Sequence, residues 1–192
     1  MINVILFGPP GSGKGTQAEF IVNKKNLTHI STGDIFRKNI TKQTQLGKLA
    51  SEFMNQGQLV PDKVTIGLLE SEIDVYKNAN GFIFDGFPRT LPQADAFKIF
   101  LNNKKMPLSV VISLEVGENE LVNRLLKRGL DSGRQDDIKK DIIRNRIQVY
   151  KKQTSTLKTY YSENLKNNFF TINGERTVDV ISKDIANILL KY

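Results

Sequence analysis

The stretch that decides the fold is Val4-Ile5-Leu6-Phe7-Gly8-Pro9-Pro10-Gly11-Ser12-Gly13-Lys14. Its apolar start predicts a buried strand, and the residues from Lys14 to about Asn23 predict a helix. The glycines between them let backbone N–H groups face an anion, and the helix N-terminus adds partial positive charge. Lys14 can then reach the outer phosphates of a nucleotide. A plain Gly/Pro turn is the alternative, but GxxxxGK between a strand and a helix favours a phosphate-binding loop.

Outward from this loop, short apolar runs alternate with helical patterns. Strands are predicted at Val4–Phe7, Phe82–Phe84, Leu108–Leu114 and Phe169–Ile172, and further helices at Asn119–Arg128 and Val178–Leu190. Strands that are apolar throughout and alternate with helices are typical of a parallel sheet covered by helices on both faces. We therefore predict the α/β class, with Phe82 and Phe84 in the core.

Two segments depart from this alternation. Residues 31–69 show helical patterns and no convincing core strand, and Gly129–Gly133 reads as a polar loop. We expect one domain over residues 1–192, with its core at 1–30, 61–126 and 138–192. A helical insertion at 31–60 and a short lid at 127–137 would complete it.

The composition excludes several classes of protein. The 192 residues include no cysteine, so disulfides, thiol nucleophiles and cysteine-based zinc or iron–sulfur sites are excluded. The one histidine, His29, cannot build a metal site alone and is expected to be structural. No apolar run approaches the roughly 20 residues of a membrane helix, and the N-terminus lacks the pattern of a signal peptide. We expect a soluble, cytoplasmic protein that does not contact a membrane.

A net charge of +8 is typical of many nucleic-acid-binding proteins, but the distribution of the basic residues along the chain does not favour such a partner. The lysines are scattered, in pairs at most, and no basic run reaches five residues. An anionic small ligand explains the charge as well. The chain otherwise favours lysine, yet it has eight arginines, whose planar fork binds phosphate in a bidentate manner that lysine cannot reproduce.

Three segments, in order, resemble motifs of the adenylate kinase family, and the similarity runs essentially end to end. They are the phosphate loop Gly8–Gln17, the STGDxxR-like segment His29–Arg37 and the DGFPRTxxQ-like segment Phe84–Gln93. The short lid and the lack of cysteine match the short-lid form, which has no zinc. The resemblance implies ATP, AMP and ADP as substrates, Mg²⁺ as cofactor and a monomer.

The resemblance also implies roles for residues at matching positions. It implies ATP binding by Gly11, Ser12, Gly13, Lys14, Gly15, Thr16, Arg124, Arg128 and Arg176. It implies AMP binding by Thr32, Arg37, Gln58, Leu59, Val60, Gly86, Phe87, Pro88, Arg89, Gln93, Arg134 and Arg146. The catalytic residues would be Lys14, Arg89, Arg128, Arg134 and Arg146.

Different arginines would contact different parts of the two nucleotides. The resemblance implies that Arg37 and Arg89 hold the AMP phosphate, that Arg128, Arg134 and Arg146 surround the transferring group, and that Arg124 lies over the ATP adenine. Surface salt bridges are the alternative reading for this set. Arg144 is expected to be solvated. The spacing between Arg134 and Arg146 is one residue longer than the family pattern, which a bulge or a later helix start would absorb.

Asp85 ends a predicted strand, where a buried carboxylate needs a cation or hydrogen-bond donors. The carboxyl end of a parallel strand faces the ligand crevice, so we expect Asp85 to be directed at Mg²⁺ through metal-bound water. A helix-capping aspartate is the alternative. The usual Ser/Thr ligand directly after the lysine is displaced, because Gly15 precedes Thr16.

The predicted reaction is reversible phosphoryl transfer from Mg·ATP to AMP, giving two ADP, and it needs no general base because the acceptor is a phosphate oxygen. Closure of the insertion and the lid would exclude water. A UMP/CMP kinase is the nearest alternative, but Thr32 and the run Thr90–Gln93 favour AMP. Two further alternatives are an ATPase switch, which needs no second site such as Arg37 and Arg89, and a nucleic-acid-binding protein.

Overall fold

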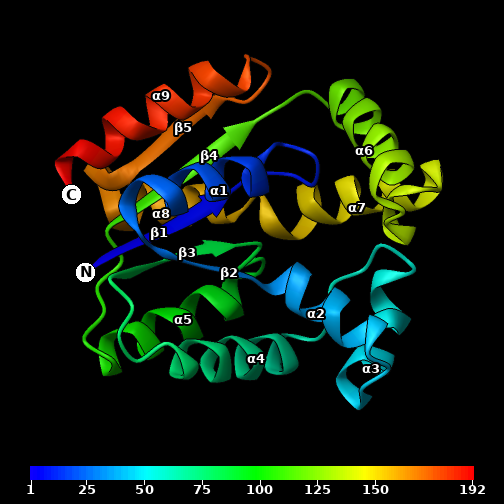
Figure 1. Cartoon of the computed structure of the whole chain (residues 1–192), viewed down its shortest axis with the longest axis horizontal. Coiled ribbons are helices and arrows are strands. Elements are labelled where there is room, and N and C mark those ends of the chain that lie inside the picture. The colour runs from blue at the N-terminus through cyan, green and yellow to red at the C-terminus, as the bar shows by residue number, and fades with distance from the viewer.

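The computed structural model describes residues 1–192 and contains a five-stranded, all-parallel sheet (Figure 1). The strand order is β2-β3-β1-β4-β5. The strands are β1 (Ile2–Phe7), β2 (Thr28–Ser31), β3 (Gly81–Asp85), β4 (Val110–Glu115) and β5 (Phe169–Asn173). The predicted α/β class with a parallel sheet is confirmed.

Nine α-helices surround the sheet. They are α1 (Lys14–Lys25), α2 (Thr32–Thr41), α3 (Gln45–Met54), α4 (Asp62–Val75), α5 (Leu91–Asn103), α6 (Glu118–Ser132), α7 (Lys140–Val149), α8 (Leu157–Leu165) and α9 (Val178–Ile188). Short 3-10 turns lie at Gln135–Asp137, Lys166–Asn168 and Leu189–Lys191, and a π-helical turn at Tyr150–Thr154 follows α7.

Each face of the sheet carries its own core. Helices α4, α5 and α8 pack with Ile5 and Phe84 on one face, while α1 and α9 pack with Leu6 and Ile112 on the other. Figure 1 shows α9 above the sheet and α4 and α5 below it, with α1 crossing in the view over β1 and β4. Phe82 and Phe84 are buried as predicted. The strands read as continuous apolar runs because helices cover both of their faces.

The sequence predicted no strand between the first helix and the helical residues 31–69. The structure has strand β2 (Thr28–Ser31) there. β2 is only four residues long, lies at the edge of the sheet and pairs with β3 alone. Polar residues at Thr28, His29 and Ser31 hide it, and only Ile30 is buried. An edge strand lacks the continuous apolar run that marks the central strands. The sheet therefore has five strands, not four.

The predicted loop at Gly129–Gly133 is wrong for most of its length, because α6 continues to Ser132. The helix ends at Gly133, which adopts the left-handed conformation with φ 65°. Gly129 lies inside the helix for a packing reason, since a Cβ there would lie 2.5 Å from the carbonyl oxygen of Asp137. The glycine marks a close approach of two backbones rather than a loop.

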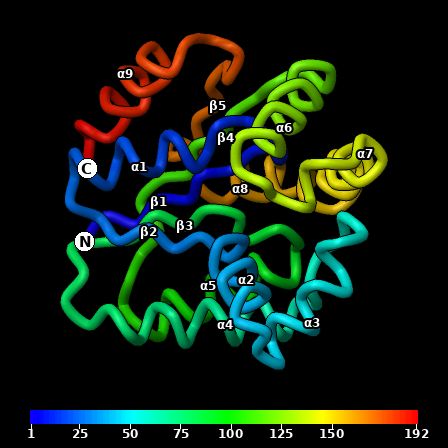
Figure 2. The backbone as a smooth tube through the Cα atoms, turned by 45° about the vertical axis from the view of Figure 1, so that its right-hand side comes forward, coloured from blue at the N-terminus to red at the C-terminus, as the bar shows by residue number.

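Two helical units lie together at the carboxyl ends of the strands. α2 and α3 form one unit, with a small core of Phe36, Ala50 and Val60. α6 and α7 form the other, packed through Leu125 and Ile147. Figure 2 shows both units at the same end of the molecule, opposite the two chain termini. Residues 31–60, the predicted insertion, contain α2 and α3.

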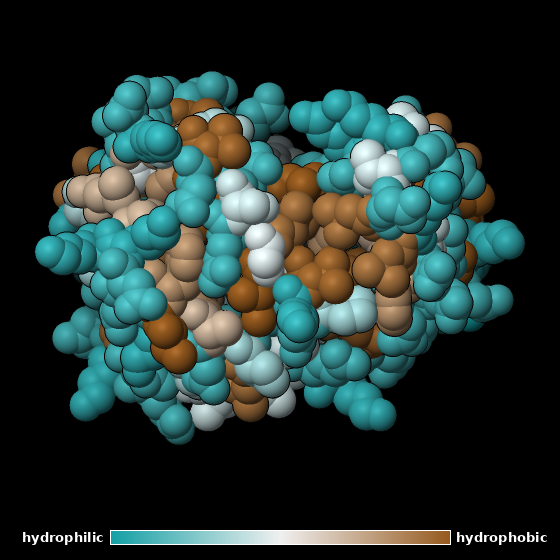
Figure 3. All heavy atoms as spheres, turned by 90° about the horizontal axis from the view of Figure 1, so that it is seen from below, coloured by the Kyte–Doolittle hydropathy of each residue, from teal (hydrophilic) through white to brown (hydrophobic).

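The face formed by α4 and α5 is not uniformly polar. Figure 3, which views the molecule from below, shows apolar atoms gathered in the middle of this face among hydrophilic ones. Val75 on α4 and Ile99 on α5 are 71% and 62% exposed. None of the helices combines the length and the low polarity that a membrane span requires.

Candidate active site

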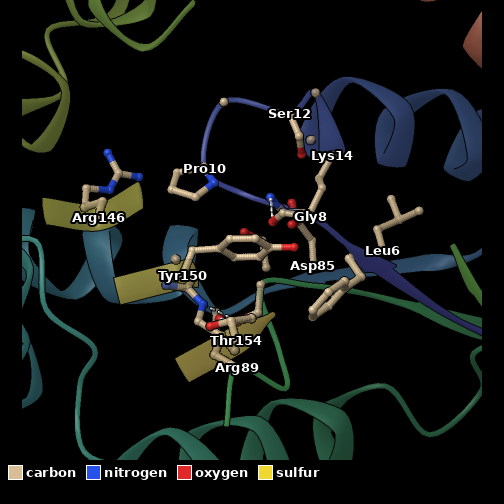
Figure 4. Close-up of a pocket in the computed structure, with 18 of the residues that line it drawn as sticks. Leu6, Gly8, Pro10, Ser12, Lys14, Asp85, Arg89, Arg146, Tyr150 and Thr154 are labelled. Atoms are coloured by element: carbon tan, nitrogen blue, oxygen red, sulfur yellow. Dashed lines mark hydrogen bonds between the residues drawn. The ribbon is translucent and has the colours of Figure 1, made fainter. Parts of the chain in front are cut away.

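A cavity of about 710 Å³ opens where β1, β2 and β3 end, between the two helical units (Figure 4). Every residue that the sequence assigned to ATP, AMP or Mg²⁺ lines this cavity, from Gly11 in the loop to Arg176 near the start of α9. Residues separated by more than 160 positions in the chain thus share one site. The structure brings the whole predicted set together.

The phosphate loop presents unpaired backbone donors to the cavity. α1 starts at Lys14, and its N-cap Gly13 has a φ of 97° and no side chain to cap the first N–H groups. Gly8 allows the loop to turn closely over β4, since a Cβ there would lie 2.6 Å from the carbonyl oxygen of Leu114. Free N–H groups at a helix N-terminus form an anion site.

Lys14 and Arg89 are the two cationic side chains of the cavity that have no carboxylate within 4.0 Å. The Lys14 ammonium donates to the carbonyl oxygens of Gly8 at 2.8 Å and Pro9 at 2.9 Å. The Arg89 guanidinium donates to the carbonyl oxygen of Gly86 at 2.7 Å.

Burial lowers the pKa of both groups, to about 8 for Lys14 and about 10 for Arg89, and neighbouring arginines add to the effect. Both cations would be stabilised by an anion in the cavity.

Arg128 and Arg146 are held by carboxylates that follow the end of α6. Arg128 Nε lies 2.7 Å from Asp137 Oδ2, and Arg146 bonds to the same Asp137 carboxylate and lies 3.1 Å from Asp136 Oδ2. Burial alone would raise the pKa of the Asp137 carboxyl, but hydrogen bonds and charge from Arg128 and Arg146 hold this pKa below its usual range. The two arginines are therefore positioned before any phosphate binds.

Arg37 and Arg134 share a carboxylate across the cavity. Asp34 Oδ1 lies 2.5 Å from Arg37 on its own helix α2, and 3.3 Å from Arg134 beyond α6. Asp136 reaches back to within 3.9 Å of Arg37. These pairs join the two helical units around the cavity mouth.

The residues predicted to read the acceptor base are partly engaged with one another. Thr32 Oγ1 donates to the carbonyl oxygen of Gly86 at 2.9 Å. Gln93 is 1% exposed, and its Oε1 accepts the N–H of Arg89 at 2.8 Å. Val60 is buried in the core of the α2–α3 unit, while Leu59 and Gln58 lie on the adjoining cavity wall.

Arg124 and Arg176 converge on the turn between β5 and α9. Arg124 Nη1 donates to the carbonyl oxygen of Gly174 at 2.8 Å, and its Nε lies 2.6 Å from Glu120. Arg176 donates to the carbonyl oxygen of Asn173 at 3.3 Å and pairs with Asp184. Both arginines line the cavity.

Asp85, at the end of β3, faces the start of α1, because a Cβ on Gly15 would lie 3.9 Å from its Oδ2. His29 Nε2 approaches the same oxygen at 3.6 Å, which is too long for a hydrogen bond. Burial alone would raise the pKa of the Asp85 carboxyl, but His29 and Lys14 outweigh it and hold this pKa below its usual range. Asp85 is therefore a carboxylate at neutral pH.

The donor set around Asp85 fits Mg²⁺ better than a metal caged by protein. The structure contains no group of three or more His, Asp and Glu side chains arranged so that they could hold a metal ion. Mg²⁺ usually keeps several waters and binds one or two carboxylates together with substrate phosphates. One ionised carboxylate beside a phosphate loop meets that requirement. Thr16 is exposed at the start of α1.

Two details of the arginine prediction can be placed in the structure. Arg144 is exposed, as expected, with Asp141 as its nearest carboxylate at 4.0 Å. The extra residue before Arg146 does not turn its side chain away from the cavity. The chain first forms the turn Gln135–Asp137, and α7 starts only at Lys140.

Sequence reasoning missed the carboxylates of the site. Asp34, Asp136 and Asp137 hold four of the predicted arginines, although all three lie inside or beside the segments that were recognised. Tyr150, in the π-helical turn, was also missed. Figure 4 shows its ring within the pocket, beneath the loop that carries Pro10. The usable signal was local and partial: Asp34 lies three residues before Arg37, and Asp136 and Asp137 follow shortly after Arg134.

The family model described as "Adenylate kinase" matches residues 6–166. The chain belongs to the adenylate kinase family. It is 53% identical to an adenylate kinase of Flavobacterium psychrophilum over 189 residues, covering 98% of both chains. It is 49% identical to one of Bacteroides fragilis over 97% of both chains, and 48% identical to one of Bacteroides thetaiotaomicron over the full length of both.

These comparisons confirm the predicted family and the predicted activity, phosphoryl transfer between ATP and AMP by a nucleoside monophosphate kinase. Substrates in the adenylate kinase family are ATP, AMP and ADP, and phosphoryl transfer there normally uses Mg²⁺. The roles of individual residues rest on the geometry of the cavity.

Proposed function

We propose that the cavity holds two nucleotides at once, with ATP at the phosphate loop and AMP between α2–α3 and the segment that follows β3. The observation that carries this proposal is the pair of cations without carboxylates, Lys14 and Arg89. Each would bind one phosphate chain. An ATPase switch would need only the first, so Arg89 favours a second nucleotide.

On the donor side, the triphosphate would lie against the N–H groups of the loop and the Lys14 ammonium. The residues proposed to bind ATP are Gly11, Ser12, Gly13, Lys14, Gly15, Thr16, Arg124, Arg128 and Arg176. Arg124 and Arg176, which converge on the turn between β5 and α9, would cover the adenine, because guanidinium planes stack on aromatic rings.

On the acceptor side, Arg37 and Arg89 would bind the AMP phosphate through bidentate hydrogen bonds. The base would lie against Thr32, Gly86 and Gln93, with Leu59 as an apolar cover. The remaining residues proposed to line the AMP site are Gln58, Val60, Phe87, Pro88, Arg134 and Arg146.

Catalysis would rest on alignment and charge. Arg128, Arg134 and Arg146 would surround the transferring group, where preorganised cations stabilise developing negative charge. Asp136 and Asp137 already hold Arg128 and Arg146 in place, so little reorganisation accompanies the reaction. The acceptor phosphate oxygen is ionised near neutral pH, and no base is required.

We propose that Asp85 holds Mg²⁺ through bound water. When bound, the ion neutralises phosphate charge that would otherwise repel the incoming nucleophile.

We also propose that residues 31–60 and 127–137 are the closing parts and that the chain works as a monomer. The ion pair of Asp34 with Arg134 supports closure, because it joins these two segments. A cytoplasmic location is proposed as well, where adenine nucleotides are abundant.

The decisive experiment measures initial rates with Mg·ATP against AMP, UMP, CMP and GMP, with a control that lacks an acceptor. We expect rapid turnover with AMP only. A preference for UMP or CMP would overturn the proposed base site while keeping the two-nucleotide cavity. ATP hydrolysis at a rate that does not depend on the acceptor would overturn the proposal that the cavity holds two nucleotides. It would favour the ATPase switch.

A further inference from the structure

Asp62, the first residue of α4, joins two segments of the proposed acceptor site. Its Oδ1 accepts a hydrogen bond from Gln93 Nε2 at 2.6 Å, and its Oδ2 accepts one from Thr90 Oγ1 at 3.0 Å. Asp62 follows the wall residues Leu59 and Val60, whereas Thr90 and Gln93 begin α5. One carboxylate thus ties together both walls of the acceptor half.

The contacts of Gln93 determine which way its amide group faces. A carboxylate can only accept hydrogen bonds, so Nε2 must face Asp62. A backbone N–H can only donate, so Oε1 must face Arg89. A flipped amide would place donor against donor at the Arg89 N–H and acceptor against acceptor at the Asp62 carboxylate. The second N–H and the second lone pair of Gln93 remain available to a ligand.

We propose that Asp62 is a specificity-determining positioning residue, which selects the acceptor base by fixing the orientation of the Gln93 amide. This inference rests on the proposed placement of the acceptor base at Gln93. Asp62 acts through Gln93 and not by contact with the base. Thr90 contributes to the same lock, because its hydroxyl donates to Asp62 and accepts the N–H of Gln93 at 3.3 Å.

The orientation matters because adenine and hypoxanthine present opposite patterns on the same edge. Adenine offers an acceptor at N1 and a donor at N6, whereas hypoxanthine offers a donor at N1 and an acceptor at O6. An amide with one fixed orientation can match only one of these patterns. IMP differs from AMP in this edge alone. It is therefore the probe for whether the orientation of the Gln93 amide is fixed.

A purely structural role for Asp62 makes a different prediction. Asp62 lies in the first turn of α4, where a negative charge stabilises any helix. Loss of that effect would lower the melting temperature without changing the choice of base. The selectivity ratio, kcat/KM for AMP divided by kcat/KM for IMP at saturating Mg·ATP, separates the two roles.

We expect Asp62→Ala to lower this ratio about tenfold, since Gln93 loses one of its two orienting partners. Asp62→Asn should keep the ratio within about twofold, because its amide oxygen can still accept from Gln93 Nε2. The matched control is Asp179→Ala, which removes an exposed acidic residue from the first turn of α9. It should leave the ratio unchanged.

Asp62→Ser provides the test if the alanine variant does not fold. Serine keeps a side-chain oxygen in the first turn of α4, but this oxygen lies one bond closer to the backbone and cannot span to Gln93. We expect the serine variant to lose selectivity as the alanine variant does. A lower melting temperature with an unchanged ratio in either variant would overturn the inference.

Gln93→Ala distinguishes failure of this inference from failure of the proposed function. A lowered ratio in Gln93→Ala with an unchanged ratio in Asp62→Ala would overturn the role of Asp62 alone. An unchanged ratio in Gln93→Ala would show that Gln93 does not contact the acceptor base. That result would overturn both the proposed acceptor site and this inference.

Discussion

Lys14 illustrates how a single residue carries both the affinity and the pH dependence of the site. Its ammonium contacts two backbone carbonyls and no carboxylate, and burial lowers its pKa to about 8. The charge is therefore present at neutral pH and is lost as the pH rises through this pKa. Loss of the charge removes a donor from the ATP phosphates.

We predict that kcat/KM for Mg·ATP is level near pH 6 to 7, falls to about half near pH 8 and then declines by nearly tenfold per pH unit, because this parameter reports the free enzyme. Rates measured from pH 6 to 10 at constant ionic strength test this. Lys14→Ala should remove the inflection and lower kcat/KM by about 100-fold or more. Lys24→Ala, an exposed lysine at the end of α1, is the control. A level profile up to pH 10 would contradict the prediction.

At this scale, the sequence identified the cations but not the residues that hold them. The chemistry of arginine suits it to bind phosphate, and the resemblance to the adenylate kinase family is what singled out Arg37, Arg128 and Arg146 for that role. The carboxylate partner of a given arginine could not be predicted, because Asp34 lies 100 residues from Arg134 in the chain. Pairing at that separation depends on how the elements pack.

At the scale of elements, the contact of α6 with the turn Gln135–Asp137 positions two proposed catalytic arginines. Gly129 permits this contact, since a Cβ there would lie 2.5 Å from the Asp137 carbonyl oxygen. Asp137 in turn holds Arg128 and Arg146. A displaced turn would move both guanidinium groups.

Gly129→Ala should therefore reduce the unfolding free energy by about 1–3 kcal/mol, the usual cost of overpacking. It should also reduce kcat by about tenfold or more, because small misplacements of catalytic groups are costly. Denaturant unfolding and initial rates measure the two effects. Gly67→Ala in α4 is the control. A Cβ there meets no atom within 4 Å, so stability should rise by up to about 1 kcal/mol. Full activity in Gly129→Ala would contradict this role.

The elements themselves were predictable where their apolar pattern was continuous. The central strands and α9 belong to this class. β2 and the last turn of α6 were not predicted, because the first is a half-buried edge strand and the second contains a glycine that normally signals a loop. Both exceptions follow from tertiary contacts that outweigh local pattern.

At the scale of the whole molecule, the two helical units contact each other directly. Asn145 Nδ2 on α7 donates to the carbonyl oxygen of Gln56, just after α3, at 2.5 Å. Gly57 packs beneath α7, since a Cβ there would lie 2.9 Å from the carbonyl oxygen of Ile142. This contact lies beside Gln58 and Leu59 of the proposed AMP site.

We predict that Asn145→Ala shifts the molecule towards an open arrangement. The loss of one hydrogen bond, worth about 1 kcal/mol, should raise KM for AMP about fivefold and leave kcat unchanged or higher. Steady-state rates with varied AMP measure this. Arg144→Ala, at the neighbouring exposed position, is the control. An unchanged KM for AMP in Asn145→Ala would show that this contact does not support closure.

The sequence by itself determined the phosphate loop, the α/β class and the adenylate kinase family, because these depend on short motifs and local apolar patterns. Only the tertiary structure decided the partners within the site. The links of Asp62 with Gln93, Asp34 with Arg134 and Asn145 with Gln56 each join residues from different elements. The strand order brings those elements together, and a hydrogen bond needs its two atoms within about 3 Å, a distance that no local pattern specifies.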